Sequence, residues 1–516
     1  MSEQELKLHV PKHARAGVQA ALRRGAVSAV RLRAQYFDTQ RSALAKAGAA
    51  LRLRLEGRRW IQTLKMPGKH QLEKLEINTA RPGPSLDLTV YENTPAAALI
   101  RKHATELKVV YQTDIRRVYR RIRTNGATVE VALDQGHIES GELKLPVSEV
   151  EFELISGQTQ GIFDLGLKWL KAHGLILDLR SKAERGTRLA ALDAQLAGLG
   201  NADDAATRAA RAKAIARFWA PRGIEPVKLT THMTCQHALS AVTAECLEQI
   251  ARNAAVLAEI DTAGLYRAAT AEHTHQLRVA IRRLRSAWSL FKALAQLPDS
   301  AQRDAIKVHF AALGNTRDDD VLRETVMPEL SAAGQPSLQF KANQSSQVTD
   351  SVASSVQFQH WLVTLLAQNV TVQNDNSTQA QPNSAPPVAL DKALGKTLQR
   401  WHQKVLADGL RFDKLAIQTQ HELRKRAKRL RYGLQFAESL LPAKRLGNYR
   451  RSLSKIQDIL GEMNDLYVAR EKFELMRDEQ PPAWFAVGWI ASRLSVLTSQ
   501  AQRAFKALEK TERFWG

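Results

Sequence analysis

The hydrophobic period of this 516-residue sequence changes near residue 200, from two residues to 3.6 residues. Up to about residue 190, apolar and polar residues mostly alternate, which is typical of half-buried β-strands. From about residue 201 the sequence is rich in Ala, Leu, Arg and Gln, has a helical period and contains no strand-like stretch. Because one core rarely grows beyond about 250 to 300 residues, we expect an α+β part with a mainly antiparallel sheet, followed by an all-α part.

In the first part, alternation predicts seven strands, and two stretches with a helical pattern predict two helices. The strands are residues 3–10, 51–55, 60–65, 72–78, 116–123, 127–133 and 147–154, and the helices are residues 14–24 and 161–172. We expect a first domain at 1–195, a connection at 196–227 and a helical domain at 228–516. The connection contains a short basic helix near 207–219. A polar insertion at about 333–387 contains one apolar helix, residues 356–368.

The charge of the chain narrows the choice of partners. Lysine and arginine number 75 against 52 acidic residues, a formal net charge of +23. Such an excess favours a polyanionic partner, which can be nucleic acid, an anionic membrane or a phosphate polymer; a generally basic, solvated surface is the alternative. The N-terminus does not resemble a signal peptide, and no apolar run approaches the roughly 20 residues of a membrane span. With Cys235 and Cys246 as the two cysteines, we expect a reducing, cytoplasmic compartment.

Nearly every predicted strand has one apolar face and one charged face. Residues two apart in a strand share a face, so Glu3, Glu5 and Lys7 point to the same side. The same spacing recurs in the sets Arg52 and Arg54, Thr63 and Lys65, Lys74 and Glu76, Glu130 and Asp134, and Glu149, Glu151 and Glu153. An ordinary half-exposed sheet also alternates. If the sheet closes on itself, however, the charged faces line one lumen, where carboxylates can hold divalent cations and basic groups can bind phosphate oxygens.

An ordered set of motifs in the first 190 residues resembles the CYTH domain of triphosphate tunnel metalloenzymes. The matching segments are Glu3-x-Glu5-x-Lys7, residues 36–39 (YFDT), 51–57 (LRLRLEG), 62–65 (QTLK), 113–117 (TDIRR), 129–136 (VEVALDQG), 148–153 (SEVEFE) and 181–186 (SKAERG). The resemblance implies an eight-stranded antiparallel β-tunnel. It also implies hydrolysis of a triphosphate by direct attack of water, with Mg²⁺ or Mn²⁺ as cofactor.

The same resemblance assigns roles to single residues. It makes Glu3, Glu5, Glu151 and Glu153 the principal metal ligands, with Glu149, Asp134 and Glu130 as further candidates. The implied triphosphate-binding residues are Lys7, Arg52, Arg54, Lys65, Lys74, Arg117 and Lys182. Lys74 stands where relatives often carry arginine, so it offers a point charge and no bidentate fork. The expected catalytic set is Glu3, Glu5, Lys7, Glu151 and Glu153.

The helical part contains an internal repeat. The segment 275–285 (HQLRVAIRRLR) recurs as 421–431 (HELRKRAKRLR), and 313–321 (LGNTRDDDV) recurs as 460–468 (LGEMNDLYV). Two motifs that recur in the same order at nearly the same offset indicate a duplication. We therefore expect two similar helical bundles related by a pseudo-twofold axis.

Each copy of the first motif places a histidine and three cations on one helix face. His275, Arg278, Arg282 and Arg285 form the first row, and His421, Arg424, Lys428 and Arg431 form the second. Such rows can match successive phosphates of a polymer. A solvated basic face is the alternative for the cations, and a core position or a metal-ligand role is the alternative for the two histidines.

These motifs resemble the CHAD domain, a helical module that binds inorganic polyphosphate, over about residues 228–516. The resemblance implies ten polyphosphate-binding residues: His275, Arg278, Arg282, Arg283, Arg285, His421, Arg424, Lys428, Arg429 and Arg431. Arg317, Lys425 and Lys455 are weaker candidates.

The sequence as a whole favours an inorganic triphosphatase whose helical domain binds polyphosphate, in some cases on polyphosphate granules. Action on nucleoside or thiamine triphosphate stays open, although no aromatic pocket is evident from the pattern. A polyphosphate-binding scaffold without turnover is the main alternative. A nucleic-acid module is less consistent with the sequence, because the two basic helices carry few stacking aromatics.

Overall fold

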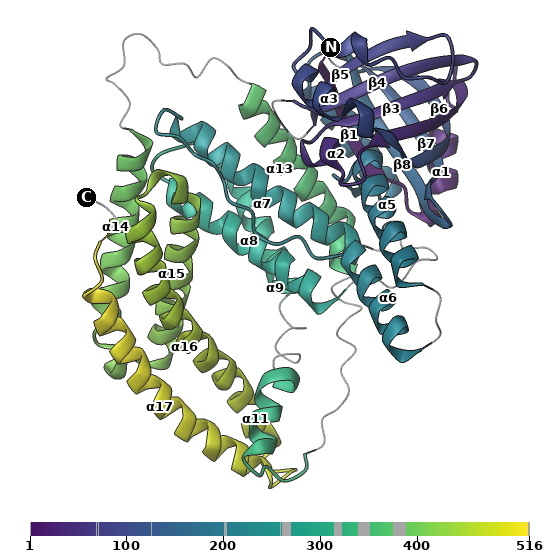
Figure 1. Ribbon diagram of the computed structural model, residues 1–516. Helices are drawn as coiled ribbons and strands as arrows, with labels where there is room; N and C mark the ends of the chain where they lie inside the picture. The colour runs from purple at the N-terminus through teal and green to yellow at the C-terminus, as the bar shows by residue number, and fades with distance from the viewer. Residues whose placement is uncertain are drawn as a thin grey trace. The chain divides into compact units, whose positions relative to one another are not determined.

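The computed structural model describes residues 2–68, 70, 72–124, 126–200, 204–258, 260, 270–313, 322–338, 351–374 and 389–513. The chain forms two compact units (Figure 1). Unit 1 comprises residues 1–222, 248–276 and 350–374, and unit 2 comprises residues 223–247, 277–349 and 375–516. Helices α7 and α8, introduced below, each contribute residues to both units.

A closed antiparallel β-barrel dominates unit 1 (Figure 1). Its strands are β1 (Ser2–His9), β2 (Ser28–Asp38), β3 (Ala50–Glu56), β4 (Arg59–Pro67), β5 (Glu73–Arg81), β6 (Lys108–Thr124), β7 (Ala127–Ser140) and β8 (Leu143–Gly157). Their order in the described part of the chain is β5-β4-β3-β2-β6-β7-β8-β1, and pairing of β1 with β5 closes the barrel. The predicted eight-stranded tunnel is therefore confirmed. A short strand, β9 (Ile176–Leu177), pairs with β1 outside this ring.

All seven strands predicted from alternation are present, and β2 is the barrel strand that the pattern missed. Its residues do alternate, but one side carries Val30, Leu32 and Ala34, while the other carries Arg31 and Arg33. The apolar side faces the lumen, which is the reverse of the charged-inside pattern in its neighbours. Strands β6, β7 and β8 also extend well beyond their predicted ends.

The outer wall of the barrel is covered by short helices. Helix α4 (Gln160–His173) packs on β1, β7 and β8, where its Trp169 meets the edge of Phe152. Residues of η2 (Leu88–Tyr91) and α3 (Ala97–His103) cover the buried Leu51 and Leu64. The other small elements of this wall are η1 (Lys12–Ala14), α1 (Arg15–Leu22), α2 (Ala43–Lys46) and η3 (Ala104–Glu106). Because this shell buries the apolar face of the other strands, their charged residues are left to line the lumen, whereas β2 lines it with apolar residues.

Helix α5 (Lys182–Leu199) packs against β6, β7 and β8, and its apolar face shares a core cluster with residues of β2. Its Ser181 N-cap accepts a hydrogen bond from the Glu184 amide at 3.1 Å. The helix comes so close to β6 that a Cβ added at Gly186 would lie 2.1 Å from the ring of Tyr111. Leu189 and Leu192 of α5 join a core cluster that also holds Phe218 of the next helix, α6 (Ala205–Phe218). Helix α6 lies where a basic helix was expected near 207–219, and it packs within unit 1.

Unit 1 also contains helical residues from much later in the chain. The end of α7 (Cys235–Leu257) places Val256 in the core cluster of α5, and α13 (Val356–Asn374) packs on α4. The Gln359 side chain of α13 accepts a hydrogen bond from the Leu177 amide of β9 at 2.8 Å. Helix α13 is the apolar helix predicted inside the polar insertion, and it runs six residues further than expected. Much of the remaining insertion, 339–350 and 375–388, lies outside the described residues.

Unit 2 is helical throughout its described residues. Its elements are the first part of α7, most of α8 (Ala271–Phe291), α9 (Ser300–Ala312), η4 (Leu322–Val326), α11 (Met327–Ala332), α14 (Leu390–Gly409), η6 (Phe412–Lys414), α15 (Ile417–Phe436), η7 (Glu438–Leu440), α16 (Ala443–Met476) and α17 (Ala483–Glu509). Helix α15 packs between α14 and α16, and α17 packs on both α14 and α16 (Figure 1). The two copies of the first repeated motif lie on α8 and α15, as predicted. Of the second motif, residues 460–468 lie on α16, whereas 314–321 lie outside the described residues. The pseudo-twofold relation stays a prediction.

Candidate functional site: a charged tunnel

A cavity of about 1000 Å³ fills the barrel and is lined by all eight strands and by the start of α5. Every residue predicted to bind triphosphate lines it: Lys7, Arg52, Arg54, Lys65, Lys74, Arg117 and Lys182. So do the predicted ligands Glu3, Glu5, Asp134, Glu151 and Glu153, together with Glu130. Glu149 lies beneath them and is buried. The fold thus brings nearly the whole predicted set into one lumen.

The acidic wall arises from strand register. Glu5 of β1 pairs with Glu153 of β8, and Glu153 pairs in turn with Glu130 of β7. Two residues further along β1, Lys7 lies opposite Glu151 of β8. Because directly paired residues project to the same side of a sheet, three neighbouring strands place their carboxylates side by side in the lumen.

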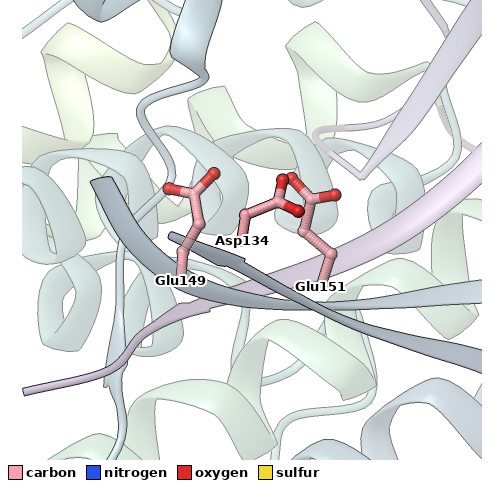
Figure 2. Close-up of side chains that lie close together, drawn as sticks. All are labelled: Asp134, Glu149 and Glu151. Atoms are coloured by element: carbon pink, nitrogen blue, oxygen red, sulfur yellow. The ribbon is translucent and has the colours of Figure 1, made fainter. Parts of the chain in front are cut away.

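One group of acids, Asp134, Glu149 and Glu151, has oxygen atoms within 4.8 Å of one another (Figure 2). Its charge is balanced by protein cations. The Lys182 ammonium lies 2.7 Å from both Asp134 and Glu151 and also contacts Glu149. Arg117 donates two hydrogen bonds to Asp134, each 2.7 Å long, and also pairs with Glu151.

The pKa values follow from this pairing. Burial by itself would raise the pKa of Glu151, but Lys182 and Arg117 outweigh it and hold that pKa well below its usual range. Burial likewise opposes ionisation of Glu149, and Arg185 and Lys182 lower its pKa. These carboxylates are therefore ionised and already neutralised by neighbouring cations.

A second group, Glu3, Glu5 and Glu153, has the opposite character. Burial, together with repulsion from Glu5 and Glu130, raises the pKa of Glu153 to about 7. Burial and then Glu151 raise the pKa of Glu5. Within the described residues, neither Glu5 nor Glu153 forms an ion pair. Desolvated acids that repel one another are stabilised by a bound divalent cation, so this donor set fits a hard metal ion better than the neutralised group does.

Glu3 lies between these acids and the cations of β4. Its carboxylate is 2.6 Å from the Lys65 ammonium, which also contacts Glu76 at 3.1 Å. Burial and a carboxyl–carboxylate hydrogen bond with Glu76 raise the pKa of Glu3, against the pull of Lys65. Lys65 can thus bind an anion only by sharing its charge with two acids.

Two arginines of β3 occupy the opposite wall. Arg52 lies 3.5 Å from both the Tyr36 hydroxyl and Glu76, and Arg54 donates a 2.6 Å hydrogen bond to Glu56. Both are partly buried, so their charges are only weakly screened by solvent. Cations of β3, β4 and β6 thus line the lumen on both sides of the acidic wall that β1, β7 and β8 form.

Sequence reasoning missed several residues of the site. They are Tyr36, Arg121, Arg185, Glu184 and Arg188. Spacing places Glu76 on the same strand face as Lys74 but gives it no role. Period two could have identified Arg121, since it shares a strand face with Arg117. Tyr36 belongs to a motif that was recognised, but its role depends on β2, which was not predicted. Of the α5 residues, Lys182 was assigned from the motif at 181–186, which also contains Glu184 and Arg185; Arg188 lies beyond that motif, in a helix that the pattern did not predict.

Comparisons with known proteins agree with this geometry. A family model described as the CYTH domain matches residues 1–187, and one described as the CHAD domain matches residues 241–474. The chain carries a CYTH domain followed by a CHAD domain. An inorganic triphosphatase from Haemophilus influenzae is 32% identical over 159 residues, which are 29% of this chain and 44% of that relative. The match therefore spans less than half of the length of that curated relative.

Several solved structures are similar to parts of the chain. The CHAD domain from the plant Ricinus communis is 26% identical, with a TM-score of 0.46, and the match covers 57% of this chain and 98% of that one. A putative adenylyl cyclase from Hippeastrum, described as having a dominant triphosphatase activity, is 19% identical, with a TM-score of 0.28, and covers 36% and 95%. A putative adenylate cyclase from Bacillus halodurans is 21% identical, with a TM-score of 0.26, and covers 34% and 91%.

The CHAD domain gathers cations from α8 and α15. Burial and the charges of Arg424, Arg282 and Arg431 lower the pKa of Lys428 to about 6, against the weaker pull of Asp465. Burial and Arg429 likewise lower the pKa of Arg285. Arg282 and Arg285, with Arg278, also lie over the ring of Phe310 on α9, at 5.1 to 5.9 Å from its centre. Cations from the two predicted rows therefore lie close together: Arg282 of the first row and Arg424, Lys428 and Arg431 of the second affect one another electrostatically.

Other predicted polyphosphate-binding residues are placed differently. Arg283 is 1% exposed, pairs with Glu245 at 2.6 Å and lies over Phe436, so its position speaks against direct contact with a polymer. His275 lies on α8 one turn before Arg278, and His421 precedes Arg424 on α15. Burial and then Lys425 lower the pKa of His421, which favours the neutral form of this histidine. Arg317 lies outside the described residues.

Proposed function

We propose that the CYTH domain hydrolyses inorganic triphosphate to pyrophosphate and phosphate with the help of a divalent cation. The observation that carries the proposal is the division of the lumen into cationic walls and a wall of unneutralised carboxylates. A site that only bound polyanions would gain nothing from Glu5 and Glu153, because both repel the ligand. Together with a metal ion, however, the same carboxylates favour phosphoryl transfer, which depends mainly on positioning and charge neutralisation.

The cationic side chains would bind and orient the phosphate chain. Arg52, Arg54 and Arg117 can each offer paired N–H donors to phosphoryl oxygens, whereas Lys65, Lys74 and Lys182 act as point charges. In the ligand-free protein several of these cations are paired with acids, so substrate binding exchanges one set of ion pairs for another. Such an exchange selects for ligands with dense negative charge.

Glu3, Glu5 and Glu153 are the residues proposed to hold Mg²⁺ or Mn²⁺, with Glu151 next to them. A divalent cation bound there supplies charge neutralisation at the phosphate and lowers the pKa of bound water. Removing the charge of one of these carboxylates would weaken metal binding, because hard cations require anionic oxygen ligands. Glu149 and Asp134 are better described as groups that fix Lys182 and Arg117.

An organic triphosphate is the second candidate substrate, and one observation favours it. The sequence pattern showed no aromatic pocket, but the structure places Tyr36, Phe37, Tyr111 and Tyr119 on the cavity wall, next to the apolar side of β2. The rings of Tyr36 and Tyr111 stack on each other at 4.6 Å. Because that contact uses one face of each ring, less aromatic surface is left for a base, and we favour the inorganic chain.

For the CHAD domain we propose binding of inorganic polyphosphate along α8 and α15. The lowered pKa of Lys428 indicates a cluster of cations that lacks sufficient counter-charge. Among the described residues, Arg282 Nε and Arg431 Nε are also buried without a hydrogen-bond acceptor. A linear polyanion would satisfy both needs. Cytoplasmic location and association with polyphosphate granules are part of this proposal; no helix among the described residues is long and apolar enough to cross a membrane.

The test is phosphate release by the purified protein with Mg²⁺ or Mn²⁺, and with EDTA as control. Tripolyphosphate, ATP, thiamine triphosphate and long-chain polyphosphate are compared at equal concentration. Selective, EDTA-sensitive hydrolysis of tripolyphosphate supports the proposal, whereas faster hydrolysis of ATP or thiamine triphosphate favours the organic substrate. Binding of tripolyphosphate without release of phosphate would contradict turnover and favour a scaffold.

A further inference from the structure

The first turn of α5 adds to the tunnel site a residue that does not belong to a barrel strand. Lys182 is the first residue of this helix, and its ammonium reaches Asp134 on β7 and Glu149 and Glu151 on β8. Ser181 caps the turn, and two strands contact it: the Tyr111 hydroxyl of β6 donates a hydrogen bond to the Ala183 carbonyl oxygen at 3.0 Å, and Arg185 pairs with Glu149 of β8. The position of Lys182 therefore depends on what holds α5.

Glu184, on the same turn, forms an ion pair with an arginine of α7. Arg252 donates two hydrogen bonds to the two carboxylate oxygens of Glu184, one of them 2.8 Å long. Both side chains are partly buried, at 17% and 29% exposure, and a bidentate arginine–carboxylate pair fixes orientation as well as distance. Glu184 itself lines the cavity.

Arg252 is in turn held rigidly on its own helix. Its Nε donates to Glu248 one turn earlier on α7. One turn later, Val256 is 5% exposed and packs in the core cluster that contains Leu189 and Leu192 of α5. Arg252 is thus a prepositioned donor on a docked helix, and not a flexible surface side chain.

A second contact holds the segment that precedes α5. Asp178 accepts two hydrogen bonds from the Arg180 guanidinium, at 2.8 and 3.1 Å, and Arg180 lies over the ring of Trp219 at 5.4 Å. The Trp219 carbonyl oxygen is 2.7 Å from His273 Nε2. This contact remains when Arg252 is changed, so loss of Arg252 would loosen the turn without releasing it.

We propose that Arg252, which lies in the part of the chain that matches the CHAD domain, is a positioning residue of the triphosphate site: through Glu184 it holds the first turn of α5, and with it Lys182, against the tunnel acids. Arg252 does not touch the substrate. The proposal rests on the proposed function for the identity of the ligand. It assigns to the CHAD domain a structural share in the tunnel site, separate from binding of polyphosphate.

Calorimetric titration of tripolyphosphate in EDTA tests this without relying on turnover. Arg252→Ala is expected to weaken binding about tenfold, since misplacement of a binding group by about 1 Å costs up to 100-fold. With metal present, KM should rise by a similar factor while kcat stays within about twofold, because Lys182 is proposed to act in binding. Arg252→Lys, which keeps the charge but loses the fork, should recover part of the affinity.

Matched variants separate positioning from general damage. Arg493→Ala removes another interhelical arginine–glutamate pair, that of Arg493 with Glu462, and should bind tripolyphosphate like the wild type. Glu184→Gln should lose affinity like Arg252→Ala, and the double variant should lose little more than either single variant. If Arg252→Ala does not fold, Arg252→Lys and Glu184→Gln carry the same test.

Wild-type affinity in Arg252→Ala, or fully additive losses in the double variant, would overturn the proposal. If the wild type binds tripolyphosphate but releases no phosphate, the proposed function fails, while the affinity series still decides the role of Arg252.

Discussion

Replacement of Glu153 by glutamine should stabilise the metal-free protein above pH 7 while it abolishes turnover. In the folded chain, burial and the nearby Glu5 and Glu130 raise the pKa of Glu153 to about 7 from an ordinary 4.5. The folded state therefore holds more protons than the unfolded state between these two values. Stability conferred on the protonated form is present at pH 4.5 and is lost as pH rises through 7.

The size of the effect follows from the pKa shift. A shift of this size corresponds to at most about 3 kcal/mol at pH 8, and solvent access to the partly exposed side chain reduces it to about 1 to 2 kcal/mol. Glutamine resembles the protonated acid in shape and never ionises. For a unit of this size, the gain corresponds to a rise of about 2 to 8 °C in melting temperature.

Scanning calorimetry in EDTA at pH 5 and pH 8 measures this effect. Glu153→Gln and the wild type should melt together at pH 5, and the variant should melt higher at pH 8. Saturating Mn²⁺ should raise the melting temperature of the wild type but not that of the variant. Glu479→Gln, at an exposed position between α16 and α17, serves as the control. Melting temperatures that stay parallel across pH would refute the reasoning.

Three further predictions concern binding and packing. Affinity for long-chain polyphosphate should fall as pH rises above about 6, because Lys428 must take up a proton to pair with the ligand. In Lys428→Arg, titrated by calorimetry, the decline should disappear. An unchanged decline would exclude Lys428 as its source. Arg282→Ala combined with Arg424→Ala should weaken polyphosphate binding and reduce its salt dependence while tripolyphosphate hydrolysis continues; equal loss of both activities would contradict separate sites. Gly186→Ala should lower stability by about 1 to 3 kcal/mol, seen as a lower melting temperature, because its Cβ would lie 2.1 Å from the Tyr111 ring; a variant as stable as the wild type would show that α5 is not closely packed there.

The sequence predicted the barrel and most of its lumen because both depend on local pattern. Glu3, Glu5 and Lys7 share a strand face by geometry alone, and closure of the sheet brings such faces together. Strand β2 was missed although its residues alternate, so period two could have found it; what the pattern could not show is that its apolar side lines the lumen. The difference between the neutralised acids and the unneutralised ones depends on Lys182, which reaches them from a helix that the pattern did not predict.

In the helical part, the helical period predicted the cation rows but not the residues that contact them. Helical spacing places Arg278, Arg282 and Arg285 together, whereas Arg283 differs from them by its buried contact with Glu245 on α7. That contact joins residues far apart in the sequence. The pairing of Arg252 with Glu184 is of the same kind: a single arginine on a long helix gives no sign of which acid it will meet.

The central claim is that the tunnel carboxylates serve metal-dependent hydrolysis, and steady-state phosphate release from tripolyphosphate with Mn²⁺ tests it most directly. Glu5→Gln keeps the shape of a side chain that has no ion pair among the described residues and removes the charge proposed to hold the metal. We predict a fall in kcat of about 100-fold or more, with Glu479→Gln unchanged and polyphosphate binding by the CHAD domain retained. Phosphate release by Glu5→Gln at the wild-type rate would contradict the account.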